Sequence, residues 1–490
     1  MRTDLNYPSV IRMMGVLLLI LGAAFVPALV VGLIYGEYDE VKAFVFTMMP
    51  CIIIGLVLIK ALGTGEIKSR HRDIYLVVTL CWLISSIIGS IPLILSGAVS
   101  NPIDAFFEIC SGFSTTGASI LTNIEGQAKS ILFWRSFTHW LGGMGIIVFM
   151  AALLPSMGIG VQMIAGAETP GPTLTKLKAK FSDTAKDLYL LYILFTIVEA
   201  VLLLLGGLNL FDSLIHTFGT VGTGGFSNYS DSLGHFTSPY VQWVVIVFML
   251  LCGINFNLYF LIPKKKIKEF FQDEELRWYL LFIAISGVLI ASMLLFKGGY
   301  HSPERAIRDA FFHVTSVITT TGFATTDYDL WPTFCRMTIL LLTIVGASSS
   351  STGGGVKVVR VLTAIKYVKR GFAQKLHPNR VINIKLNGKP LAQQVVTDIV
   401  YFIFLYVGVL IIGTILISFD GFDITTNFTA ALTCLSNVGP GLGAVGPAMN
   451  FSGFSNFSTF VLSIMMIAGR LELFTFVMLF APHFWNSNRV

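Results

Sequence analysis

The sequence has few charged residues. Aspartate, glutamate, lysine and arginine make up 12% of the 490 residues, against roughly 25% in typical soluble domains. Hydrophobic residues make up 54%, and the mean hydropathy is +0.77. This shortage of charge excludes an ordinary soluble globular protein. We therefore expect an integral membrane protein, whose spanning helices contact lipid rather than water.

The chain also lacks paired cysteines and the signatures of catalysis. Its six cysteines stand singly in or beside apolar stretches, so we expect packing residues rather than metal ligands or disulfides. We find no nucleophile with a base, no metal triad and no cofactor motif, and expect neither an enzyme nor a cofactor. The net charge of +6 lies in separate loops rather than on one basic face, which excludes a nucleic-acid partner.

Apolar stretches of spanning length occur along the whole chain. A spanning helix needs about 20 mostly apolar residues, and residues 13–35 and 43–62 predict an N-terminal helix pair. The first stretch is long enough to remain as a span rather than to be cleaved as a signal. Further stretches lie at 74–95, 131–154, 188–205, 241–261, 278–296, 336 onward, 396–417 and 460–480. Together they predict about ten spans.

A short motif occurs four times, each time between two of these stretches. The copies are DAFFEICSGFSTTGAS at 104–119, DSLIHTFGTVGTGGFS at 212–227, DAFFHVTSVITTTGFAT at 309–325 and NFTAALTCLSNVGPGLG at 427–443. Aligned on their glycines, they make Gly117, Gly224, Gly322 and Gly439 equivalent. The motif helices are too short to cross, so we expect re-entrant half-helices. The predicted fold is an all-α membrane protein with four pseudo-symmetric helix, re-entrant pore helix, helix units around a central pore.

The predicted boundaries follow the repeat. They are residues 1–68 for the N-terminal pair, 69–160 for unit 1, 161–268 for unit 2, 269–380 for unit 3 and 381–490 for unit 4. Lysine and arginine concentrate before the first span, after the second and between consecutive units, with a few outer exceptions such as Lys129. The positive-inside rule places these loops and the N-terminus in the cytoplasm, so each motif enters from outside.

A half-helix that enters from outside turns its C-terminal carbonyls toward the membrane centre. Four such ends would hold a cation, and glycine can aim its carbonyl inward from backbone angles that other residues avoid. The predicted selectivity filter comprises Thr115, Thr116, Gly117, Thr223, Gly224, Thr320, Thr321, Gly322, Asn437, Val438 and Gly439. The alternative, that the glycines serve only helix packing, does not explain four copies on one predicted face.

The second helix of unit 3 is interrupted by the sequence GASSSSTGGG. Glycine costs about 1 kcal/mol relative to alanine in a helix, and serine hydroxyls compete for backbone bonds. We therefore predict a break inside the membrane, beneath the filter, rather than a cytoplasmic linker. The predicted loop comprises Gly346, Ala347, Ser348, Ser349, Ser350, Ser351, Thr352, Gly353, Gly354 and Gly355.

Several ionisable residues lie in apolar surroundings. Arg470 falls within the last predicted span, where a charge usually faces a cavity. A pair with Glu472 is disfavoured by helix geometry, so we expect Arg470 to face the pore below the filter. Arg135 and Arg336 start second helices and are predicted to anchor at the membrane interface. His216 and His313 lie in motif helices without metal-like spacing, and we expect packing or loop bracing.

The motifs resemble those of the Trk/Ktr/HKT superfamily of cation transporters, and most closely the TrkH/TrkG group of its Trk branch. The resemblance rests on SGFSTTGAS, WRSFTHWLGGMGIIV, GTGGFS, TTTGFATTDYD, GASSSSTGGGVKVVR, SNVGPGLG and GRLELFT, and covers nearly the whole chain. It implies potassium uptake across the bacterial cytoplasmic (inner) membrane, with loop 346–355 as a gate and Arg470 as a basic residue in the pore. It also implies K⁺ ligands, the backbone carbonyls of Thr116, Gly117, Thr223, Gly224, Thr321, Gly322, Val438 and Gly439.

The resemblance further implies a homodimer and a cytoplasmic TrkA-type regulatory subunit that carries the nucleotide, NAD or ATP. The chain itself has no phosphate-binding loop, because GASSSSTGGG lacks the required lysine. The basic stretch 357–389 suits an anionic lipid surface or a docked protein. Open alternatives are a sodium-conducting or broadly monovalent relative, an alternating-access cation/proton symporter, and a receptor without transport.

Overall fold

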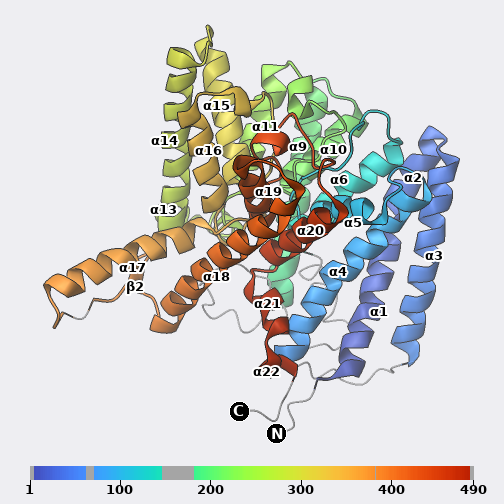
Figure 1. Cartoon of the computed structure of the whole chain (residues 1–490), viewed down its shortest axis with the longest axis horizontal. Helices are drawn as coiled ribbons and strands as arrows, with labels where there is room; N and C mark the ends of the chain where they lie inside the picture. The colour runs from blue at the N-terminus through green and yellow to red at the C-terminus, as the bar shows by residue number, and fades with distance from the viewer. Residues whose placement is uncertain (1–4, 62–70, 146–180, 381, 486–490) are drawn as a thin grey trace.

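The computed structural model describes residues 5–61, 71–145, 181–380 and 382–485. The part of the predicted span 131–154 that follows Gly145 lies outside these residues, as do the basic residues of 62–70 and 146–180. The described chain is mostly helical (Figure 1). One short antiparallel hairpin pairs β1 (Lys385–Leu386) with β2 (Lys389–Pro390). The prediction of an all-α membrane protein is confirmed at this level.

The predicted N-terminal helix pair is present. The helices α1 (Tyr7–Ala24) and α2 (Val26–Tyr35) form one apolar span, and α3 (Tyr38–Ala61) packs along α1. Glycines allow the close approach, since a side-chain carbon at Gly55 would come within 3 Å of the Gly15 carbonyl oxygen. In Figure 1 this pair forms the blue edge of the molecule.

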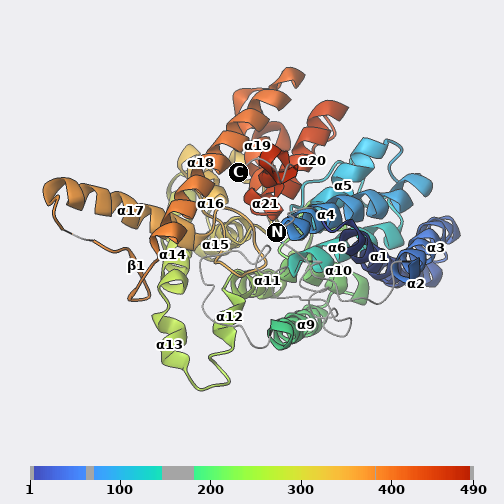
Figure 2. The ribbon, with the colours of Figure 1, turned by 90° about the horizontal axis from the view of Figure 1, so that it is seen from below.

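The rest of the chain repeats a sequence of long helix, short motif helix and medium helix. The three-helix sets are α4 (His71–Leu95), α5 (Pro102–Phe113) and α6 (Lys129–Gly143); α9 (Phe181–Leu205), α10 (Leu210–Val221) and α11 (Pro239–Cys252); α14 (Glu274–Lys297), α15 (Pro303–Ile318) and α16 (Thr333–Val345); α18 (Gln393–Ile417), α19 (Ile424–Ser436) and α20 (Asn456–Arg470). Seen from below, the sets follow one another around the middle of the molecule (Figure 2).

The remaining elements lie within, between or after these sets. They are α12 (Phe256–Tyr259), α13 (Ile267–Gln272), α17 (Val358–Leu376), α21 (Phe474–Val477), α22 (Pro482–Trp485) and the 3-10 turns η2 (Ser232–His235), η3 (Tyr328–Leu330), η4 (Ser418–Asp420), η5 (Gly443–Val445) and η6 (Met478–Phe480). The basic helix α17 and the β hairpin extend away from the helix sets in both views (Figures 1 and 2).

In the part of the chain that the structure describes, fewer helices reach spanning length than the sequence predicts. Among the described residues, six helices are long and apolar enough to cross a membrane, or seven if a bent pair counts as one span. The third helices of the sets fall short: α6, α11, α16 and α20 have 15, 14, 13 and 15 residues. At a rise of about 1.5 Å per residue, each covers less than the roughly 30 Å of the hydrocarbon core.

The helix break that the sequence predicts in unit 3 has a counterpart in unit 4. The helix α16 ends at Val345 before the glycine-serine segment, as expected, but α20 also ends within the predicted span 460–480, at Arg470. The chain there bends by 114° into α21 and η6. The continuous last span is thus wrong, because Glu472 and Leu473 take positive φ angles that a helix cannot include.

Candidate functional site

The four motif helices end in the same way. Each is followed by a residue of positive φ: Thr115 at 56°, Thr223 at 54°, Thr320 at 59° and Asn437 at 56°. The next N–H donates to a carbonyl five residues back in every copy, which closes the helix C-terminus in a Schellman-type turn. Three of the four are threonines, for which such angles are strained, and strain of this kind gathers at functional sites.

The backbone corrects the alignment of the second copy by one residue. The glycines two residues after these turns, Gly117, Gly225, Gly322 and Gly439, all have positive φ, between 80° and 96°. The residue equivalent to Gly117 is therefore Gly225, and Gly224 corresponds to the residue before each glycine. Two adjacent glycines allowed either alignment, whereas the spacing of 13 residues from Asp104 to Gly117 and from Asp309 to Gly322, counted from Asp212, leads to Gly225.

We call residues 114–119, 222–227, 319–324 and 436–441 loops 1 to 4. They meet through their backbones in cyclic order. A side-chain carbon at Gly117 would overlap the carbonyl oxygen of Gly224, and one at Gly225 would overlap that of Thr321. The same holds for Gly322 and Val438, and for Gly439 and Thr116. Each glycine thus touches the next loop, and loop 4 returns to loop 1. We call these contacts the glycine ring.

The glycine ring borders a hollow of about 90 Å³ lined by all four ring glycines. The predicted filter residues preceding them are fully buried, with Thr115, Thr116, Thr223, Thr320 and Thr321 at 0% exposure. The structure therefore brings the four predicted loops together around one opening. Backbone carbonyls gathered in this way suit a weakly hydrated monovalent cation.

At the rim of this hollow, Glu125 ties loop 1's outer segment to residues after loop 2. Ser230 donates to the Glu125 carboxylate from its N–H at 2.7 Å and from its hydroxyl at 2.6 Å. These hydrogen bonds lower the pKa of Glu125 from its ordinary value. The carboxylate form therefore favours the bridged arrangement.

The predicted gating loop lies against the ends of the third and fourth motif helices. The Gly354 N–H donates to the Thr320 hydroxyl at 2.6 Å. A side-chain carbon at Gly353 would stand 2.7 Å from the Thr319 carbonyl oxygen, and one at Gly354 would overlap that of Ser436. The segment therefore fits directly beneath loops 3 and 4, with no room for larger residues.

Hydrogen bonds hold this loop in place at several points. Ser349 donates to the buried Glu275 carboxylate from its N–H at 2.6 Å and from its hydroxyl at 2.7 Å. The Ser348 N–H donates to the Gly253 carbonyl at 3.1 Å, and the Thr352 hydroxyl to the Cys252 carbonyl at 3.3 Å. The loop is thus tied to the end of α11, where helical carbonyls are otherwise unpaired.

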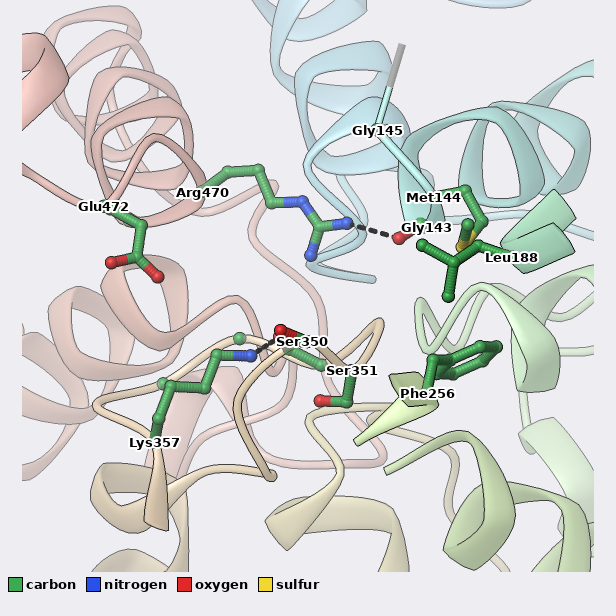
Figure 3. A pocket seen from close by; sticks show the side chains of 14 residues that line it. Gly143, Met144, Gly145, Leu188, Phe256, Ser350, Ser351, Lys357, Arg470 and Glu472 are labelled. Carbon is green, nitrogen blue, oxygen red and sulfur yellow. Dashed lines mark hydrogen bonds between the residues drawn. The ribbon is translucent and has the colours of Figure 1, made fainter. Parts of the chain in front are cut away.

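Arg470 spans the hollow beside this loop, which measures about 110 Å³ (Figure 3). Its guanidinium donates to the carbonyl of Thr352 at 2.8 Å, and to those of Gly142 and Gly143 at 2.6 and 2.9 Å. It therefore connects the loop to the C-terminal end of α6. The expectation of loop carbonyls rather than Glu472 as partners agrees with this geometry, since Glu472 pairs with Arg360.

Sequence reasoning missed Lys357. Its side chain is 2% exposed, and its ammonium group donates to the Gly353 carbonyl within the same loop (Figure 3). Lys357 also has a φ of 81°, so the chain turns sharply before α17 begins. A buried lysine needs such partners. Its position directly after the GGGV segment could have indicated a side chain that contacts the loop.

The interfacial position predicted for Arg135 is wrong. Its side chain is 1% exposed and its Nε donates to Glu108 at 2.6 Å. Arg336 is partly exposed and lies 3.4 Å from Asp329, which leaves the anchoring prediction open. A polar residue at the Glu108 position recurs in three copies, as Glu108, His216 and His313, and this repetition could have indicated a buried partner.

The histidines brace their own loops, as predicted. His216 contacts the Ser227 hydroxyl at 3.0 Å, and His313 contacts the Thr326 hydroxyl at 3.3 Å. All six cysteines are buried and free, which confirms that they form no disulfides. Within the described ranges, no group of three or more His, Cys, Asp or Glu side chains could hold a metal.

Comparisons with known proteins agree along nearly the full length. The family model TrkH, a cation transport protein, matches residues 40–487. The chain is 36% identical over 490 residues to the Trk system potassium uptake protein TrkH of Escherichia coli (strain K12), covering 99% of this chain and 100% of that one. It is 33% identical over 481 residues to TrkG of the same strain, covering 98% of each. The crystal structure of the potassium transporter TrkH from Vibrio parahaemolyticus matches with a TM-score of 0.89 at 32% identity, covering 98% and 100%.

Proposed function

The chain belongs to the TrkH family of cation transport proteins, and we propose on this premise that it takes up potassium across the bacterial cytoplasmic membrane. The relatives that it matches over nearly their whole length are named potassium uptake proteins. The six or seven apolar spans found among the described residues suit a multi-pass membrane protein. The observation that carries the proposal is the glycine ring, because four loops from distant parts of the chain meet through backbone contacts at four glycines.

In this proposal, the four helix sets enclose a pore and form the units expected from the sequence, after the N-terminal pair. Dehydrated K⁺ passes the glycine ring and is held by backbone carbonyls. The carbonyls are those of Thr116, Gly117, Gly224, Gly225, Thr321, Gly322, Val438 and Gly439, with Gly225 replacing the Thr223 expected from the sequence. Carbonyl oxygens replace the hydration shell of K⁺, and they offer nothing to an anion.

Residues 346–355 act as the gate in this proposal. Gly353 and Gly354 lie against the ends of the motif helices. Arg470 donates to the Thr352 carbonyl, and Lys357 donates to the Gly353 carbonyl. The loop therefore closes the path on the side of the hollow that contains Arg470. The partly buried guanidinium of Arg470 and the buried side chain of Lys357 hold the loop by its carbonyls, and their positive charge repels K⁺. Moving the loop would break both sets of contacts at once.

The proposed partners are a TrkA-type cytoplasmic subunit carrying NAD or ATP, a second copy of this chain and membrane lipid. The protruding helix α17 and the β hairpin are the natural contact for a cytoplasmic subunit, since they extend beyond the helix sets (Figure 2). This requires a cytoplasmic N-terminus and outward-facing motif loops, as the positive-inside rule predicts.

Complementation tests the proposed function. The gene should restore growth of a potassium-uptake-deficient bacterium at low external K⁺, and purified protein in liposomes should carry K⁺ and Rb⁺ in preference to Na⁺. Equal Na⁺ flux would favour a broadly monovalent relative. Proton movement in fixed ratio with K⁺ would favour a symporter, whereas no cation flux with or without the partner subunit would contradict transport.

A further inference from the structure

One face of α6 carries two buried polar side chains, Arg135 and His139. They are four residues apart, which places them on the same side of the helix. Their exposed fractions are 1% and 0%. Although α6 follows loop 1 in the chain, both side chains reach residues of loop 2. They therefore connect two motif copies beside the glycine ring.

The guanidinium of Arg135 joins the first motif helix to the end of loop 2. It donates to the Glu108 carboxylate at 2.6 Å and to the Ser119 hydroxyl at 3.2 Å. It also donates to the Ser227 carbonyl at 3.5 Å and lies 4.2 Å from the centre of the Phe226 ring. The buried charge is thus paired, and its cation–π contact holds the residue after Gly225.

The imidazole of His139 bonds to the backbone of both copies. The Phe226 N–H donates to its Nε2 at 3.2 Å, and its Nδ1 lies 2.8 Å from the Gly112 carbonyl oxygen. A ring that accepts at Nε2 and is neutral carries its proton at Nδ1, so Nδ1 donates to Gly112. The ring also packs on Phe226, with centroids 4.2 Å apart.

Loop 2 lacks a side chain where the other loops have one. The residues equivalent to Gly224 are Thr116, Thr321 and Val438, and the two threonine hydroxyls bond within their own loops, at 2.7 and 2.8 Å. A side-chain carbon at Gly224 would overlap the ring of His139. The imidazole therefore fills, from another copy, the space that a local side chain would occupy.

We propose that Arg135 and His139 are positioning residues that hold loop 2 in the glycine ring and thereby set the discrimination between K⁺ and Na⁺. The inference rests on the proposed function. Loop 2 contributes the Gly224 carbonyl, which touches Gly117, and it has no local side chain behind that peptide. Without the two side chains, the carbonyl can move toward a smaller ion, and the penalty for coordinating Na⁺ falls.

The first test replaces His139 and measures ion competition. His139→Leu removes both hydrogen bonds and leaves the Phe226 N–H and the Gly112 carbonyl unpaired. We expect the KM for K⁺ to rise and Na⁺ to compete about tenfold better, because tenfold corresponds to roughly one lost buried hydrogen bond. Vmax should change less. His139→Gln keeps one donor and one acceptor and should retain most discrimination. Unchanged KM and Na⁺ competition in His139→Leu would overturn the inference.

The neighbouring Trp140 supplies a matched control on the same helix. Its indole N–H donates to the Thr196 hydroxyl, away from loop 2. Trp140→Phe removes one partly buried hydrogen bond of α6 but should leave the ratio of K⁺ to Na⁺ transport unchanged. A change as large as that of His139→Leu would mean that discrimination depends on the stability of α6 in general, which also overturns the inference.

A double variant covers the case in which His139→Leu does not fold. Gly224→Ala alone should impair K⁺ discrimination, because the new methyl group overlaps the imidazole. His139→Ala makes room for it, so Gly224→Ala with His139→Ala should discriminate better than Gly224→Ala alone. Additive losses would contradict the contact. Absence of K⁺ uptake by the wild-type protein would contradict the proposed function itself, whereas wild-type uptake with additive losses contradicts only this inference.

Discussion

The glycine ring and the proposed gate below it are built in different ways. The ring uses the same backbone turn four times, and its contacts follow one cyclic pattern from loop to loop. The proposed gate is built once: its loop is 346–355, its lysine follows two residues after that loop, and its arginine comes from the last helix set. The ring contains no charged side chain, whereas the gate contains Lys357 and Arg470.

This difference separates two tasks. A site that replaces the hydration shell of an ion needs similar oxygens on all sides, and repetition of one turn supplies them. A gate must adopt two arrangements, and a few contacts from one side can be released together. Changes to the ring should therefore abolish transport, and changes to the gate should increase it.

The largest effect is expected from Gly225→Ala in the ring. The new methyl group would overlap the Thr321 carbonyl oxygen, and the φ of 80° is unfavourable for alanine. K⁺ uptake should fall to background in liposomes and in cells. Gly408→Ala in α18 is the control, because nothing lies within 4 Å of that position, and it should transport normally. Wild-type uptake by Gly225→Ala would break the comparison.

A large effect in the opposite direction is expected from Arg470→Ala in the gate. The substitution removes three hydrogen bonds to carbonyls, including that of Thr352, and removes a positive charge from the path. K⁺ flux through liposomes without partner subunit should rise about tenfold or more, since each such bond contributes roughly 1 to 3 kcal/mol. Arg336→Ala removes a partly exposed arginine and serves as control. Reduced flux with intact folding would show that Arg470 does not hold the gate closed.

Glu275→Gln should produce a smaller increase. Glutamine can still accept the hydrogen bond from the Ser349 N–H, but it loses the charge that strengthens both bonds. The gate contacts of Lys357 and Arg470 remain. We expect K⁺ flux without the partner subunit to rise about threefold, because the substitution weakens two hydrogen bonds without removing either in full. The flux is measured in the same liposomes as that of Arg470→Ala. An increase equal to that of Arg470→Ala would mean that Glu275 alone keeps the loop in place.

The smallest effect concerns the outer rim at low pH. Hydrogen bonds from Ser230 lower the pKa of Glu125 below its ordinary value of 4.5. The stabilisation is thus complete above that value and lost as external pH falls through the lowered pKa. Glu125→Gln should reproduce the acid behaviour at neutral pH, with a slight loss of K⁺ affinity and no further change on acidification. Acid sensitivity that persists in Glu125→Gln would exclude this carboxylate as its source.

The repeat predicted much of this arrangement, because local backbone chemistry determines it. The sequence pattern predicts the helix caps, the short amphipathic helices and the threonine-glycine turns, and it also predicts the break at Gly346. The alignment on Gly224 is wrong because two glycines are adjacent there; the φ angles identify Gly225, and so does its spacing from Asp212. The prediction of a continuous last span was wrong because the residues around the end of α20 are apolar enough for an unbroken helix.

Contacts between copies were beyond a single sequence. Arg135 stands at the start of an apolar stretch, where interfacial anchoring is common. Its partner Glu108 lies in a preceding helix, and its contacts with Phe226 and Ser227 come from another copy. Pairings of this kind depend on how the helix sets are placed around one another. The periodicity of a single segment does not contain that information.

The short third helices α6, α11, α16 and α20 also determine where an electrical potential acts. In the proposed pore, water entering from either face would reach the ends of these helices, and the membrane voltage would then fall mainly across the few residues between the glycine ring and the proposed gate. A charge moved through the whole voltage changes energy by about 2.3 kcal/mol per 100 mV. Arg470 and Lys357 lie in this narrow region. Even a small displacement of the gate would therefore couple uptake to the potential of the cell.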